Sequence, residues 1–230
     1  MIIAVEGADR SGKATQVRNI LSYLRSQGIS AETFDYPHYQ GPFGGMAGDY
    51  LHGKFGPVRD VLPELHMLIY ANDRKYYHDH QIKEWLDSGK WVVFDRYTYS
   101  NAFAVAKCRQ EVWEEKIQFL ETLEFKWWEL PRAAQNFYLH IPPELSFSLR
   151  NAGNKDVVRK EEEKKSEQAD LHEIDFTLQR DVTRVYEYLT KRRPAEWSFI
   201  DQMVDGARLS ADDVFNLRIK PVIDQLIKNK

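Results

Sequence analysis

The sequence predicts an α/β fold, with a five-stranded parallel sheet and helices on both of its faces. Short apolar runs alternate with stretches of helical periodicity along the whole chain, which is the pattern of strand-helix-strand units. Several of the runs are too continuously apolar to face water on either side. A glycine-containing loop directly follows the first run, as in sheets that bind ligands at their carboxyl edge.

The strands are expected at five short runs rich in β-branched and aromatic residues. Strands buried on both faces lose the alternation of apolar and polar residues, so these runs suit a sheet that is covered on both sides. The runs are IIAVEG (2–7), AETFDYP (31–37), WVVFDRY (91–97), NFYLHIP (136–142) and WSFIDQ (197–202).

Helical periodicity occupies the stretches between these runs. After the first run, apolar residues recur at helical spacing until Gly28, namely at Val17, Ile20, Leu21 and Leu24. Further helices are expected over 64–88, over 111–129 before Pro131, and from Ile174 to Leu189 before Pro194. Ser210 and Asp213 have the spacing of a capping box that opens a last helix, which Pro221 is expected to kink or interrupt.

Two stretches have neither pattern. Residues 37–45 are rich in proline and glycine and are expected to form a loop. Residues 150–170 are highly charged, so composition alone favours a solvated connection, and the functional alternative is a mobile lid that closes over bound nucleotide. The whole chain, 1–230, is expected to form one domain that includes this lid.

Composition excludes several classes of function. A net charge of −3 and a pI near 6.2 give no electrostatic basis for nucleic-acid binding. Cys108 is the only cysteine, which excludes a disulfide framework and a cysteine-based metal site. The first apolar run is too short for a signal peptide or a membrane span, so we expect a cytoplasmic protein with no membrane partner.

The loop after the first strand has the pattern G-x-x-x-x-G-K, from Gly7 through Gly12 to Lys13. Glycines allow successive backbone N–H groups to point at phosphate oxygens, and the positive end of the following helix adds to their attraction. We therefore predict a P-loop NTPase fold and a nucleoside triphosphate site. Its residues are Gly7, Ala8, Asp9, Arg10, Ser11, Gly12, Lys13, Ala14 and Thr15.

Ala14 stands where this pattern usually has the hydroxyl that coordinates magnesium. Two replacements are possible: Thr15 supplies a hydroxyl from the next position, or Asp95 holds the ion through its water shell. Magnesium commonly keeps several waters, so we expect weakened coordination and not its loss. Arg96 follows Asp95 at the carboxyl end of a strand, which favours an anion site there.

Four segments, in the same order and spacing, resemble the thymidylate kinase family. They are VEGADRSGK, YPHYQGPFG, the ANDR of a helix and FDRYTYSNAFA; the later LP, DLHEIDFTLQRDVTRVYEYL and WSFID fit more loosely. The resemblance spans nearly the whole chain. It implies a nucleoside monophosphate kinase, usually a homodimer, that transfers the γ-phosphate of ATP to dTMP with magnesium and gives dTDP and ADP.

The resemblance also implies roles for individual residues. Asp9 would hold the sugar 3′-hydroxyl of the acceptor and Arg96 its phosphate, while Arg10 would neutralise charge on the moving phosphoryl group. Arg150, in the lid, would contact ATP. The residues expected around dTMP are Asp9, Tyr36, Tyr39, Tyr70, Arg74, Arg96, Ser100 and Asn101, with Tyr70 stacked on the base and Arg74 at a base carbonyl.

Spacing supports part of this pocket. Tyr70 and Arg74 are four residues apart on an expected helix, so they share a face, and Leu65, Leu68 and Ile69 are expected to anchor that helix on the sheet. An aromatic ring beside a fork of donors suits a flat base with carbonyl oxygens.

Two other functions remain open at this point. A deoxynucleoside kinase, or a monophosphate kinase of broader specificity, would use the same ATP site; Ala104 leaves tolerance of dUMP undecided. The first of these needs a general base, and no acid in the loop is evidently placed for one. A nucleotide-dependent regulatory binding protein would need no second substrate pocket.

Overall fold

A computed structural model describes residues 1–152 and 175–229 of the chain. Its main sheet has five parallel strands in the order β2-β3-β1-β4-β5, so the prediction of an α/β fold with this sheet is confirmed. The strands are β1 (Ile2–Gly7), β2 (Ala31–Asp35), β3 (Trp91–Asp95), β4 (Gln135–His140) and β5 (Trp197–Asp201). β1 lies at the centre, with Val5 beside Asp95 of β3 and Gly7 beside Leu139 of β4.

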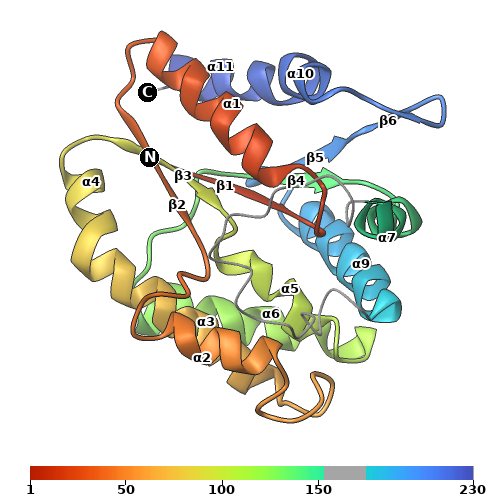
Figure 1. The fold of residues 1–230 in the computed structure, drawn as a ribbon. Coiled ribbons are helices and arrows are strands. Elements are labelled where there is room, and N and C mark those ends of the chain that lie inside the picture. The colour runs from red at the N-terminus through yellow and green to blue at the C-terminus, as the bar shows by residue number, and fades with distance from the viewer. Residues whose placement is uncertain (153–174, 230) are drawn as a thin grey trace.

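Helices cover both faces of this sheet (Figure 1). On one face lie α1 (Lys13–Ser26), α10 (Ala211–Val214) and α11 (Lys220–Lys228), with the π-helical segment η6 (Phe215–Ile219) between the last two. The helices of the other face are α2 (Gly44–Leu51), α3 (Pro63–Tyr77), α4 (Lys83–Asp87), α5 (Ala102–Val105), α6 (Trp113–Glu121) and α9 (Phe176–Arg192). α7 (Pro143–Ala152) follows β4 at the edge of the molecule.

Separate apolar clusters fill the two faces. α1 buries the predicted stripe of Val17, Ile20, Leu21 and Leu24 against β1 and β3, together with Ile219 and Ile223 of the C-terminal segment. On the other face the core joins α2, α3, α5, α6 and α9. The strands are thus covered on both sides, as their continuous apolar runs predict.

The helical predictions hold with changes at several points. The stretch 64–88 contains α3, the π-helical segment η1 (His78–Ile82) and α4, and the stretch 111–129 contains η3 (Gln110–Val112), α6 and the π-helical segment η4 (Thr122–Trp127). The Ser210 hydroxyl accepts a hydrogen bond from the Asp213 amide, which confirms the cap. Pro221 was expected to kink or interrupt the last helix. It lies in the first turn of α11, where the missing N–H is tolerated.

Leu65 does not anchor α3 as expected. Its side chain is 46% exposed, whereas Met67 and Ile69 are buried and belong to a cluster with residues of α5 and α6. α3 therefore packs mainly on other helices and not directly on the sheet, and the prediction for Leu65 was wrong. Helix α2 begins inside the stretch 37–45 that was expected to be loop.

Three further segments connect these layers. After β3 the chain forms a short 3-10 helix, η2 (Thr98–Asn101), which leads into α5. After β5 a small antiparallel hairpin, β6 (Met203–Val204) and β7 (Ala207–Arg208), precedes α10. Most of the expected lid, 150–170, lies outside the described residues; its first three residues close α7.

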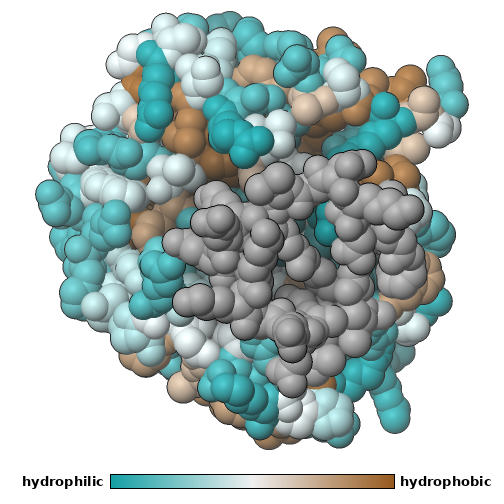
Figure 2. All heavy atoms as spheres, in the orientation of Figure 1, coloured by the Kyte–Doolittle hydropathy of each residue, from teal (hydrophilic) through white to brown (hydrophobic). Residues whose placement is uncertain are grey.

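The outer surface is mostly hydrophilic over the described part of the face drawn in Figure 2, as expected when the apolar side chains are buried between the sheet and its helices. Apolar residues there form smaller groups. Among the described residues no helix is both long and apolar enough to span a membrane.

Candidate active site

The site is built at the carboxyl edge of the sheet, where the ends of β1 and β3 lie side by side. Two loops start there: residues 8–12, which lead from β1 into α1, and residues 96–101, which lead from β3 into α5. Because the strands are neighbours in the sheet, the loops meet above it.

The first loop has the shape of an anion cradle. Gly12 has φ 93° and begins α1 without any side-chain cap, so the first amides of the helix keep their donors for another partner. Gly7 has φ 151°, and a Cβ atom there would lie 2.8 Å from both the carbonyl oxygen of Leu139 and Oγ of Ser11. Both glycines are therefore required by the backbone, as the phosphate-binding pattern predicts.

Lys13 bends back over this loop. Its Nζ donates to the carbonyl oxygens of Gly7 at 3.3 Å and Ala8 at 2.9 Å. Burial, together with repulsion from Arg96, lowers the pKa of Lys13 to about 8. The carboxylates of Asp9, Asp95 and Glu6 have the opposite effect and offset part of this fall. A phosphate in place of these neutral carbonyls would give the ammonium group of Lys13 a negatively charged partner.

The C-terminal hairpin holds the other end of the cradle, a contact that the sequence did not indicate. Arg208 of β7 donates through Nη2 to the carbonyl oxygens of Arg10 at 3.3 Å and Ser11 at 3.2 Å. Gln202 donates through Nε2 to the same Ser11 carbonyl at 2.9 Å. Arg10 itself has φ 60°, in the left-handed region that non-glycine residues seldom adopt.

Asp9 joins the cradle to three other parts of the chain. One carboxylate oxygen accepts a hydrogen bond from Nη2 of Arg96, and the other accepts from Nε2 of Gln179 on α9 at 3.2 Å. Its main-chain oxygen accepts from Oγ of Ser146 on α7 at 2.7 Å. The structure therefore brings together Asp9 and Arg96, which were both expected at the acceptor, and adds Gln179 and Ser146 beside them.

A buried carboxylate on β1 holds the second loop from below. Glu6 is completely buried and accepts hydrogen bonds from the amide of Tyr97 at 2.9 Å, from Oγ of Ser100 at 2.6 Å and from the hydroxyl of Tyr186 at 3.0 Å. Burial raises the pKa of Glu6, and these donors oppose that rise. The acid in the otherwise apolar run IIAVEG was a signal of this role that sequence reasoning passed over.

A second buried carboxylate, Glu124 of η4, holds the same loop from the other side. It accepts from Nε and Nη2 of Arg74 at 2.9 and 2.5 Å, from Oγ1 of Thr98 at 2.8 Å and from Nδ2 of Asn101 at 3.2 Å. Arg74 is only 1% exposed. Two of its five N–H groups are thus occupied within the protein, and a ligand can meet those of Nη1 and the second N–H of Nη2.

The remaining acceptor residues lie around this cluster. Tyr70 is half-buried on α3, with its ring 5.0 Å from that of His66 and 6.3 Å from that of Tyr50. Tyr36 is buried among aromatic rings, and burial raises its pKa well above its ordinary value. Tyr39 is 54% exposed, so it lies farther out.

The residues suggested for magnesium differ in their surroundings. Oγ1 of Thr15 accepts a hydrogen bond from Arg18 at 3.0 Å on the exposed side of α1, which does not favour it as a ligand. Asp95 ends β3 next to the cradle, and its charge acts on Lys13. Within 1–152 and 175–229 no group of three potential ligands could hold a metal. Of the two residues, Asp95 is therefore the better placed to hold an ion through its water shell.

Comparison with known proteins adds to this geometry. The family model described as thymidylate kinase matches residues 5–201. The chain belongs to the thymidylate kinase family. It is therefore a nucleoside monophosphate kinase by family, and the resemblance inferred from the sequence motifs is confirmed.

Individual relatives agree with the family match. The chain is 28% identical to a thymidylate kinase of Mycobacterium tuberculosis over 215 residues, which are 92% of this chain and 96% of the relative. It is 28% identical to that of Plasmodium falciparum over 187 residues, 80% of this chain and 83% of the relative. The solved structure of thymidylate kinase from Candida albicans matches with a TM-score of 0.72 at 19% identity, over 100% of this chain and 93% of that one, and it supports the fold.

Lys13 provides a prediction about proton uptake. Since its pKa in the empty protein is about 8, a nucleotide phosphate beside it should raise that pKa and cause ATP to bind with uptake of protons. Uptake should be clear at about pH 9 and small at about pH 7, where Lys13 is already protonated. Calorimetric titrations in two buffers of different ionisation enthalpy measure it. Equal uptake at both pH values would contradict this role.

Proposed function

We propose that this chain transfers the γ-phosphate of ATP to dTMP, giving ADP and dTDP. The observation that carries the proposal is the contact between Asp9 and Arg96, because it joins the phosphate cradle to the loop that would receive the second substrate. A donor site and an acceptor site that share this ion pair would hold two phosphorylated ligands end to end.

The acceptor would be held by groups that the structure already brings together. Arg96, which is 20% exposed, would turn part of its guanidinium from Asp9 to the phosphate of dTMP, and Asp9 would hold the 3′-hydroxyl. Tyr70 would stack on thymine. Nη1 of Arg74 would meet a base carbonyl, with Asn101 at the base edge.

No general base is required for this reaction. The second pKa of a phosphate monoester is about 6, so most of the acceptor is already a dianion at neutral pH. The barrier comes from repulsion between two polyanions, and cations placed between them lower it. The two loops and the start of α1 supply these cations, which are Arg10, Arg96 and Lys13.

Magnesium bound with ATP would neutralise part of the phosphate charge. We propose that Asp95 holds this ion through water, because Ala14 offers no hydroxyl and Thr15 is engaged by Arg18. Arg150, proposed from the family resemblance to contact ATP, lies at the edge of the described chain.

The competing functions would need a different site. A deoxynucleoside kinase must deprotonate a 5′-hydroxyl, and it has no use for an arginine at the acceptor phosphate. A regulatory nucleotide-binding protein would need no donors at a base. The arrangement of Asp9, Arg96, Arg74 and Asn101 therefore favours the monophosphate kinase.

A coupled assay of ADP release, with ATP, magnesium and a panel of acceptors, tests the proposal. We expect rapid turnover with dTMP and slow turnover with purine monophosphates and with thymidine. ADP release that is faster with thymidine would indicate a deoxynucleoside kinase. Release that no acceptor accelerates would contradict every kinase function.

Arg10 provides a prediction about the chemical step. The change Arg10→Ala should lower kcat by about 10³-fold or more, because an arginine on the moving phosphoryl group contributes that much in related reactions. The KM for dTMP should change little. Arg25→Ala, at the far end of α1, is the control and should leave kcat unchanged. Near-normal kcat in Arg10→Ala would reject the role.

We also propose a homodimer, which the family resemblance implies. Four large apolar side chains are exposed on segments of the α3 side of the molecule. They are Met46 on α2, Leu62 and Leu65 at the start of α3, and Trp127 on η4. Exposed groups of this kind commonly mark an interface with another chain.

The dimer is tested by sedimentation of surface variants. Leu65→Glu should dissociate it into monomers, since a charge would be buried without a partner. Leu217→Glu is the control, because Leu217 is 61% exposed on the opposite face and should not affect association. Unchanged sedimentation of Leu65→Glu would place the interface elsewhere or exclude it.

A further inference from the structure

Glu124 is surrounded by hydrogen-bond donors and lies beneath the expected base pocket. It is completely buried, and its oxygens accept four hydrogen bonds, two from Arg74 and one each from Thr98 and Asn101. Four donors match the four lone-pair sites of an ionised carboxylate. The side chain has no capacity left for a ligand, so it can act only through the residues that it holds.

The most informative of these residues is Asn101. A carboxylate can only accept, so the NH₂ end of the Asn101 amide must face Glu124. The carbonyl end, Oδ1, then points the other way. Asn101 is 1% exposed, and its Oδ1 has no hydrogen-bond partner among residues 1–152 and 175–229. A buried acceptor in this state is unfavourable by itself and suits a ligand that brings an N–H group.

We propose that Glu124 is a positioning residue that sets base selectivity. It fixes the amide of Asn101 with its acceptor toward the ligand and fixes the guanidinium of Arg74 with a donor beside that acceptor. An acceptor next to a donor matches the N3–H and the neighbouring 4-carbonyl of thymine or uracil. Cytosine has an acceptor at N3 and an amino group beside it, so both contacts would be repulsive. The inference rests on the proposed function, since it needs a pyrimidine in this pocket.

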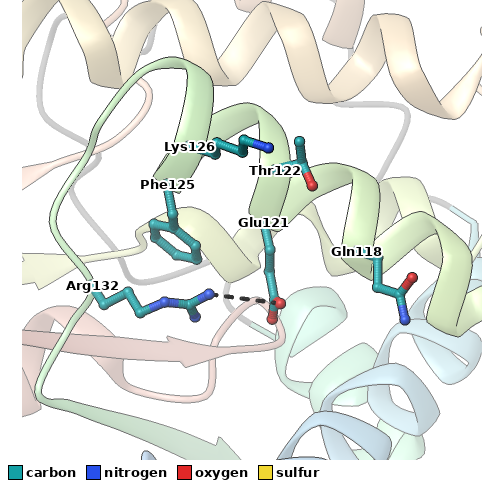
Figure 3. Close-up of a pocket in the computed structure, with 6 residues that line it drawn as sticks. All are labelled: Gln118, Glu121, Thr122, Phe125, Lys126 and Arg132. Carbon is teal, nitrogen blue, oxygen red and sulfur yellow. Dashed lines mark ion pairs between the residues drawn. The ribbon is translucent and has the colours of Figure 1, made fainter.

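Glu121, one turn earlier, provides a matched control. It is also a largely buried carboxylate, 9% exposed, but its partners are Arg192 and Arg193 of the α9 end at 2.8 Å each, and the hydroxyl of Tyr99 at 2.9 Å. Figure 3 shows it pointing toward Arg132, with which it forms an ion pair across an open pocket. The pocket is lined by Gln118, Glu121, Thr122, Phe125, Lys126 and Arg132.

The test is the change Glu124→Gln, with kcat and KM measured for dTMP and for dCMP. A glutamine can donate to Asn101, so the amide of Asn101 can turn and present its NH₂ end to the base. We expect the ratio of kcat/KM for dTMP to that for dCMP to fall about tenfold or more, mainly because KM for dTMP rises. Glu121→Gln should keep the ratio of the unchanged protein, even if it lowers stability.

A second variant covers the case in which Glu124→Gln leaves Arg74 unpaired and the protein does not fold. Glu124→Asp keeps the negative charge for Arg74 but is one methylene shorter, so we expect it to lose one of the two partners that Glu124 holds, Arg74 or Asn101. The same fall in the ratio is expected. An unchanged ratio in the folded variant would overturn the inference, as would an unchanged protein that does not distinguish dTMP from dCMP. Failure of the unchanged protein to phosphorylate any pyrimidine monophosphate would instead reject the proposed function.

Discussion

The site depends on two carboxylates buried beneath the loop 96–101. Glu6 accepts from Tyr97 and Ser100, and Glu124 accepts from Thr98 and Asn101, so two pairs of residues, each three apart in the loop, are tied to opposite supports. Burying an ionised carboxylate is strongly unfavourable unless donors surround it. The loop supplies those donors, and in return its own conformation is fixed. Arg96 is held at the start of this loop with φ 69°, a strained conformation that the neighbouring contacts maintain.

The two supports connect the pocket to distant parts of the fold. Glu6 also accepts from Tyr186, and Asp9 from Gln179, so α9 contacts both the end of β1 and the loop that follows it. Glu124 ties α3, through Arg74, to the same loop. Asp9, Arg96, Asn101 and Arg74, which would meet sugar, phosphate and base, thus belong to hydrogen-bonded segments that support one another. Such an arrangement can hold a substrate in a reactive position with little rearrangement.

The sequence was sufficient for most of the architecture. Each of the five strands was predicted within two residues at either end, because continuous apolar runs of this length are specific for buried strands. The cradle was predictable from Gly7 and Gly12, because its backbone has positive φ angles there that other residues rarely adopt. The hairpin of β6 and β7 could not be predicted, since its strands have two residues each and no periodicity. The exposure of Leu65 was missed because helical spacing does not tell which face meets another helix and which meets solvent.

The sequence offered candidate site residues but not the residues that support them. Glu124 lies in an ordinary helical stretch, and nothing in its spacing relates it to Arg74, fifty positions earlier in the chain. Gln179, Ser146 and Arg208 reach the cradle from segments that the chain brings back only through the order of its strands. Long-range partners of this kind depend on tertiary packing, which a single sequence does not show. The sequence therefore suggested that Arg74 contacts the base, but it did not show that Arg74 is also paired with Glu124.

The central claim is that the loop 96–101 is already arranged for the acceptor before any ligand binds. A crystal structure with dTMP and an unreactive ATP analogue tests it most directly. The account predicts that the backbone of this loop shifts by less than about 1 Å, with Oδ1 of Asn101 at the N3–H of thymine and Arg96 on the phosphate. A loop rebuilt around the ligand and detached from Glu6 or Glu124, or a base bound away from Asn101, would contradict it.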